Sequence, residues 1–163
     1  MKTRKLTVMA LTTALAMILS FVESQIPAFV AVPGVKMGLA NIAVVFAMYK
    51  LGWKEAVLIS LIRVVLVSML FGSIAAMFYS LAGAALSLLG MGLLKKTGKF
   101  TEIVVSVAGG ILHNIGQIAM ASILLETDAL KCYLPFLLIS GILAGVVIGI
   151  VSAVMVKRIQ IQV

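Results

Sequence analysis

The sequence predicts an all-α membrane protein, a compact bundle of six transmembrane helices in one domain, residues 1–163. Of its 163 residues, 63% are hydrophobic and only 11% are charged, whereas soluble domains are about 45–50% apolar and about 25% charged. The apolar residues form successive runs close to the length that crosses a bilayer. Short basic clusters separate several of these runs, which is typical of membrane proteins. Lipid is therefore the expected solvent for most of the surface.

Each predicted helix is an apolar run bounded by charged, glycine or proline residues. Residues 2–5 and the run after them resemble a signal peptide, but five further runs follow, so we expect the first to be a retained helix. The apolar loop at 23–35 contains prolines, and it either folds over a cavity mouth or lies at the headgroup boundary. The six predicted helices cover residues 7–22, 36–51, 54–71, 73–94, 101–125 and 131–156.

The charge distribution predicts that both termini are cytoplasmic. The expected location is a bacterial cell membrane. With this topology, Lys36 and Lys131 lie outside and Arg63 lies within a helix, while three acids (Glu23, Glu126 and Asp128) are outside. The inverted topology would reverse the usual excess of positive charge on the inner side. The basic residues expected inside are Lys2, Arg4, Lys5, Lys50, Lys54, Lys95, Lys96, Lys99, Lys157 and Arg158.

Polar residues within the predicted helices are the candidate ligand-binding groups. Arg63 falls near the middle of the third helix, where an ionised side chain usually faces a bundle interior or a watery cavity. His113 and Gln117 are one helical turn apart on the fifth helix and share a face, while Asn114 points about 100° away. Each of these residues could instead make structural hydrogen bonds between helices.

The second helix adds Lys36 and Asn41 on its outer half. With Arg63 and the polar residues of the fifth helix, these side chains could converge on one cavity that opens outward. The positive groups, and the absence of an acid deep in the membrane, favour a neutral or anionic small molecule such as a carboxylate or phosphate.

Small residues predict close helix contacts. Gly141, Gly145 and Gly149 recur every four residues on the sixth helix, and Ala10 and Ala14 do so on the first. In lipid, such spacing lets helix backbones approach each other closely. The spacing leaves open whether each face meets a helix of the same chain or of another subunit. Two glycines at 109–110 could also allow a local break in the fifth helix.

Several functional classes lack their sequence signals. The chain has no G-x-x-x-x-G-K-[ST] phosphate loop, no aspartate-rich Mg²⁺ motif and no metal-binding Cys/His spacing, with one His and one Cys in total. The net charge of +8 follows the membrane topology, whereas a nucleic-acid surface would gather its basic residues on one soluble face. We expect no enzyme activity, no cofactor and no nucleic-acid partner.

Four short blocks resemble the Gx transporter family, also labelled heptaprenyl diphosphate synthase component I. They are P-G-V-K-M-G-L-A-N-I at 33–42, G-W-K-E-A at 52–56, L-I-R at 61–63 and H-N-I-G-Q at 113–117. The blocks occur in the family's order, and the resemblance covers roughly residues 5–155. The family is itself similar to the substrate-binding S components of energy-coupling factor (ECF) transporters.

This resemblance implies a six-helix subunit that captures a small molecule from outside, with vitamin-like and isoprenoid compounds as the candidates. Such a subunit works with a transmembrane coupling subunit and two cytoplasmic ATPases, and Ala10 and Ala14 match the A-x-x-x-A pattern that contacts the coupling subunit. Two alternatives stay open. One is a membrane subunit of heptaprenyl diphosphate or quinone biosynthesis, although a prenyl diphosphate synthase would carry aspartate-rich motifs. The other is a scaffold of a membrane redox assembly.

Overall fold

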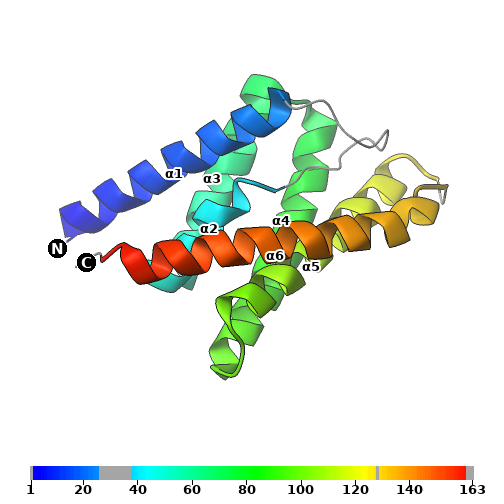
Figure 1. Ribbon diagram of the computed structural model, residues 1–163. Helices are drawn as coiled ribbons and strands as arrows, with labels where there is room; N and C mark the ends of the chain where they lie inside the picture. Colours follow the sequence, from blue (N-terminus) through cyan, green and yellow to red (C-terminus); the bar gives the residue numbers. More distant parts are fainter. Residues whose placement is uncertain (1, 26–37, 128, 161–163) are drawn as a thin grey trace.

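Six α-helices make up most of the part of the chain that the computed structural model describes, residues 2–25, 38–127 and 129–160. A 3₁₀ turn, η1 (Ala129–Tyr133), precedes the last helix, and these ranges contain no strand. The described part of the chain is therefore all-helical, as predicted. The α-helices are α1 (Lys2–Gln25), α2 (Asn41–Lys50), α3 (Trp53–Phe71), α4 (Ile74–Thr97), α5 (Glu102–Leu124) and α6 (Leu134–Arg158) (Figure 1).

Four helices are long and apolar enough to cross a membrane: α1 (from Thr3), α4, α5 and α6. Helix α3 has 19 residues but carries Lys54, Glu55 and Arg63. Helix α2 has only 10 residues, about 15 Å of helix, which is half of a hydrocarbon core about 30 Å thick. The described helices thus indicate a membrane protein with four spans of sufficient length, and the count of six spans stays a prediction.

The predicted second helix is shorter than expected because the chain turns at Gly38. This residue has a positive φ of 77°, a conformation that glycine adopts without steric cost. The backbone N–H of Asn41 donates a 2.8 Å hydrogen bond to the Gly38 carbonyl, and α2 begins at Asn41. Lys36 and the predicted loop residues 26–35 lie outside the described residues.

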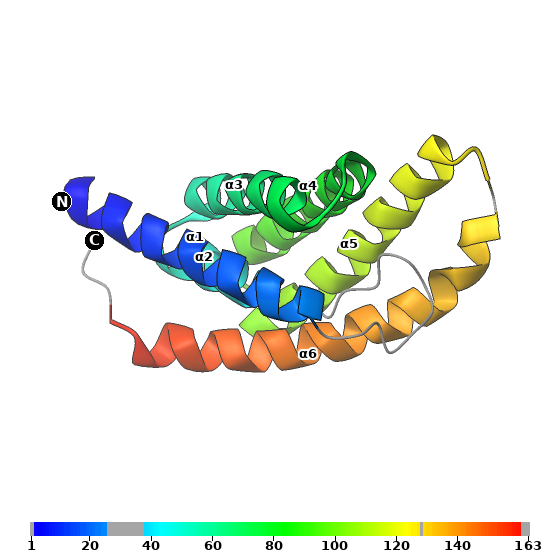
Figure 2. The same cartoon turned by 90° about the horizontal axis from the view of Figure 1, so that it is seen from above.

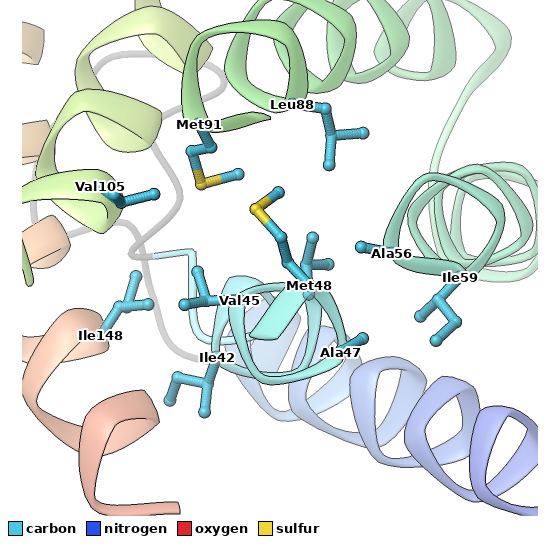
Figure 3. Close-up of a cluster of buried hydrophobic side chains, with 11 residues drawn as sticks. Ile42, Val45, Ala47, Met48, Ala56, Ile59, Leu88, Met91, Val105 and Ile148 are labelled. Carbon is cyan, nitrogen blue, oxygen red and sulfur yellow. The ribbon is translucent and has the colours of Figure 1, made fainter. Parts of the chain in front are cut away.

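Helix α2 lies at the centre of the hydrophobic core. Every residue from Ile42 to Met48 is buried, as expected for a helix that is apolar on all sides. Its side chains pack against core residues of α3, α4, α5 and α6 (Figure 3). The neighbouring core residues are Ala56 and Ile59 of α3, Leu88 and Met91 of α4, Val105 of α5 and Ile148 of α6.

Two polar contacts hold α2 between its neighbours. The Lys95 ammonium of α4 donates to the Met48 carbonyl, one of the last four carbonyls of α2, which have no partner within the helix. Lys95 also lies 4.9 Å from the centre of the Tyr49 ring. Near the start of α2, the Ile42 carbonyl accepts a hydrogen bond of 3.3 Å from Ser152 of α6.

Glycines bring α5 into direct backbone contact with α4 and α6. A Cβ added at Gly116 would lie 2.7 Å from the Ala82 carbonyl oxygen of α4, and one at Gly110 would lie 2.5 Å from the Gly141 carbonyl oxygen of α6. Any larger residue would separate these helices, which pack through close backbone approach. Helix α5 is continuous from 102 to 124, so Gly109 and Gly110 serve packing and do not break the helix.

The glycine series of α6 packs within this chain. A Cβ at Gly145 would meet Val107 Cα at 2.7 Å, and one at Gly149 would meet Ile103 Cα at the same distance. Both contacts are with α5. The glycine face of α6 therefore meets a helix of the same chain and not one of another subunit.

The ends of the bundle are arranged so that the start of α1 and the end of α6 lie on the same side of the molecule (Figures 1 and 2). Seen from above, α6 runs along one side and α3 and α4 lie on the other (Figure 2). Helix α2 contacts both α3 and α6, so it connects the two sides.

Candidate functional site

A polar cavity of about 60 Å³ lies between the helices, several times the 10–15 Å³ or so that one water occupies by this measure. It has room for a few waters or for a small polar ligand. Helices α1, α3, α4, α5 and α6 line it, together with Gly38 and the start of α2. Its polar lining residues are Ser20, Glu23, Asn41, Arg63, Ser68, Ser80, His113, Asn114 and Gln117.

Five of the six predicted ligand-binding residues line this one cavity, although they come from three helices. They are Asn41, Arg63, His113, Asn114 and Gln117. The sixth, Lys36, lies outside the described residues. The structure thus brings the five side chains together, while their role in binding stays a prediction.

Arg63 reaches from α3 toward α1. Its Nη1 lies 3.5 Å from the Ser20 hydroxyl oxygen, which is long for a hydrogen bond. Its Nε is buried and has no hydrogen-bond partner among the described residues. A buried donor without a partner is costly, so the guanidinium retains capacity to bind an acceptor in the cavity.

Glu23, predicted to lie outside in the loop at 23–35, belongs instead to the last turn of α1 and lies beside the cavity. Its side chain is only 8% exposed, it lines the cavity, and its carboxylate accepts a hydrogen bond from the Gly38 amide. The Glu23 carboxylate also interacts electrostatically with the Arg63 guanidinium. The positive charge of Arg63 is therefore partly offset, and the argument from charge for a simple anionic ligand loses much of its force.

His113 and Gln117 lie against α4 at Gly83. A Cβ at Gly83 would come within 2.8 Å of Gln117 Cγ and 3.0 Å of His113 Cε1. Both side chains therefore need a glycine opposite them to fit beside α4. Their shared face on α5 is the one expected from their spacing of one turn.

Asn114 points to the other neighbour of α5. Its side-chain amide donates a 2.6 Å hydrogen bond to the Leu137 carbonyl of α6, and the residue is buried. The side-chain nitrogen of Asn114 therefore makes an interhelical hydrogen bond, which was the structural alternative to ligand binding. Asn114 also lines the cavity. Asn41 is the first residue of α2, and its side chain lies beside Gly38.

Sequence reasoning missed Ser20 and Glu23. Their signal was present in the spacing: Thr12, Ala16, Ser20 and Glu23 follow one another at intervals of four, four and three residues, which places them on one face of α1. All four are buried. The small and polar character of this face distinguishes it from the rest of α1, which is rich in large apolar residues.

Ala10 and Ala14, the predicted contacts with a coupling subunit, are exposed on another face of α1. Neither side chain is covered by the described part of the chain. The pair is thus available to a neighbour in the membrane, but its partner stays a prediction.

The described residues contain no group of three or more His, Cys, Asp or Glu side chains placed to hold a metal ion. From the described residues, the cavity receives one guanidinium, one carboxylate, an imidazole, amides and hydroxyls. These groups can bind and orient a polar molecule through hydrogen bonds and charge. Fold and cavity together define an all-helical protein of the membrane type with an internal polar cavity.

The family of the chain is shown by the match of a family model described as heptaprenyl diphosphate synthase component I, which covers residues 12–155. The chain belongs to this family, and the resemblance seen in its sequence blocks is confirmed for that label. The description names one component of a larger assembly. Comparison with curated proteins and with solved structures found no match.

Proposed function

We propose that this chain is the substrate-binding membrane subunit of an ECF-type uptake transporter for a small polar molecule. The observation that carries the proposal is the polar cavity, into which α1, α3 and α5 bring Glu23, Arg63, His113 and Gln117. Ionisable residues inside a membrane helix bundle are costly and usually mark a functional pathway or site. A binding role accounts for this concentration of polar groups.

The orphaned Nε of Arg63 supports a binding role over a purely structural one. A structural arginine would be expected to satisfy its donors on neighbouring carbonyls or carboxylates. Here the described residues offer only a long contact to Ser20 and the charge of Glu23. A bound acceptor would supply the missing partner.

Transport by this chain would need energy from other subunits. The sequence carries no ATP-binding phosphate loop. We therefore assign ATP hydrolysis to two cytoplasmic ATPases, which a transmembrane coupling subunit would link to this chain. The exposed Ala10 and Ala14 are the proposed contact with that subunit, because small residues allow two membrane helices to approach closely. The chain itself is proposed to have no enzyme activity.

The proposed location is the bacterial cell membrane with both termini in the cytoplasm. The start of α1 and the end of α6 lie on one side of the molecule (Figure 1), as an even number of crossings would place them. The excess of basic residues at the cytoplasmic ends is the sequence support for this orientation.

Affinity purification of the tagged chain from its host membranes in mild detergent, followed by mass spectrometry, tests this proposal. A coupling subunit and a pair of ATPases should co-purify. They should be lost with Ala10→Leu/Ala14→Leu and retained with Ala85→Leu, a matched substitution at an exposed alanine of α4. Recovery of no ATPase with the unmodified chain would overturn the transporter proposal.

The binding role of the cavity is tested separately through Arg63→Ala. Small molecules released from the purified protein are identified by mass spectrometry, with Arg158→Ala at the exposed end of α6 as the control. A hydrogen bond to a charged group contributes about 1.5–3 kcal/mol, so we expect a compound held by the unmodified chain to be at least about tenfold depleted in Arg63→Ala. Equal recovery from folded Arg63→Ala would contradict the assignment.

A second candidate function follows from the family description. The chain would then be the membrane component of a heptaprenyl diphosphate synthase, with the catalytic metal-binding residues supplied by a partner. Prenyl transfer by that partner would have to increase when this chain is added. A partner whose activity is the same with and without the chain would exclude this candidate.

A further inference from the structure

Arg63 and Glu23 place opposite demands on any molecule that enters the cavity. A guanidinium only donates hydrogen bonds, and an ionised carboxylate only accepts them. Both line the same cavity. A ligand that presents an acceptor to Arg63 and a donor to Glu23 can therefore pair with both groups.

The two charged groups are neighbours across the gap between α1 and α3. Ser20 and Glu23 are one helical turn apart on α1 and share a face. Arg63 Nη1 lies 3.5 Å from the Ser20 hydroxyl, so the guanidinium extends onto the face of α1 that carries Glu23. An electrostatic interaction between Arg63 and Glu23 agrees with this arrangement.

The surroundings of this pair make charge matching important. Glu23 is only 8% exposed, and the nearby Val64, Val67 and Ile148 complete an apolar part of the wall. In such a low-dielectric setting, a lone anion would gain from Arg63 but would be repelled by Glu23, since charges interact more strongly there than in water. A lone cation would be attracted by Glu23 and repelled by Arg63.

We propose that the cavity binds a small zwitterion, whose anionic group faces Arg63 and whose protonated amine faces Glu23, and that Glu23 is the residue that sets this specificity. The inference rests on the proposed binding function of the cavity. It changes the expected substrate class from a neutral or anionic molecule to one that carries both charges. Glu23 also holds the Gly38 amide, so its carboxylate is already fixed in orientation before a ligand arrives.

Three probes with the same three-carbon skeleton test the inference on the full-length chain in mild detergent: β-alanine, propionate and propylamine. The melting temperature is measured against the concentration of each probe, because a ligand that binds the folded state raises it. β-Alanine should raise the melting temperature at a concentration at least about tenfold below that needed for either singly charged probe.

The variants separate specificity from general stability. Glu23→Gln keeps an oxygen that can accept from Gly38 but removes the charge, so its preference should shift from β-alanine toward propionate. Glu55→Gln is the matched control, since Glu55 pairs with Lys5 away from the cavity, and its preference should equal that of the unmodified chain. If Glu23→Gln fails to fold, the comparison of the three probes on the unmodified chain is sufficient to test the inference.

The result that would overturn the inference is a response to propionate as strong as that to β-alanine in the unmodified chain, or no response to β-alanine. An unchanged preference in folded Glu23→Gln would overturn the role of that residue. These outcomes are distinct from failure of the transporter proposal, which is judged by the ATPases that co-purify.

Discussion

The two sides of the cavity are packed in different ways. On the α4–α6 side, glycines let the backbones of three long helices touch, as at Gly116 against Ala82 and Gly110 against Gly141. On the α1–α3 side, the contacts include side-chain pairs, namely the ion pair between Lys5 and Glu55 and the approach of Arg63 to Ser20. The cavity lies between these two sides and takes polar residues from both.

Because of this difference, the α4–α6 side should resist deformation and the α1–α3 side should be able to adjust. Backbone contacts leave no side chain that could rotate to absorb a change, and closely packed interiors transmit strain. Side-chain contacts can be remade in another rotamer. His113 and Gln117 therefore stand on the rigid side, and Glu23 and Arg63 on the adaptable one.

The largest effect is expected where a side chain is added between backbones. Gly116→Ala would place a Cβ 2.7 Å from the Ala82 carbonyl oxygen and 2.9 Å from Gly83 Cα. Overpacking of this kind costs about 1–3 kcal/mol, so the melting temperature of the purified protein should fall clearly. Gly90→Ala is the control, because its Cβ would meet only the movable end of Leu112. Equal effects of the two substitutions would contradict the contrast between backbone and side-chain packing.

A smaller effect is expected for the hydrogen bond that joins α5 to α6. Asn114→Ala removes the 2.6 Å contact to the Leu137 carbonyl. Hydrogen bonds between membrane helices contribute about 0.6 kcal/mol on average and at most about 1.7 kcal/mol, so the melting temperature should fall modestly. Gln117→Ala, on the cavity face of the same helix, should change it less. The reverse order would show that Gln117 and not Asn114 holds the helices together.

The smallest effect is expected at the ion pair between α1 and α3. Lys5 and Glu55 are 39% and 19% exposed, and pairs in contact with solvent contribute about 0–1 kcal/mol. Glu55→Gln should therefore lower the melting temperature slightly, and the difference from the unmodified chain should shrink at about 1 M salt. A loss as large as that of Gly116→Ala would mean that the α1–α3 side depends on this pair.

Some residues of the site were predicted from the sequence, and others became visible only in the structure. Arg63, His113 and Gln117 were recognisable because a polar residue within an apolar run is conspicuous. Glu23 was placed outside because it stands at the end of an apolar run, beside a loop. Its burial depends on the Gly38 amide and on Arg63, which are distant in sequence and become neighbours only after folding.

The sequence by itself determined the solvent and the helices of this protein, because the length and composition of an apolar run decide whether it is helical and where it is stable. Only the tertiary structure decided that α2 is a short central helix, that the glycines of α6 pack on α5, and that an acid joins the arginine in the cavity. These features depend on which helix faces lie together. Lipid provides little hydrophobic force between helices, so the detailed fit of backbones and polar groups selects those pairings.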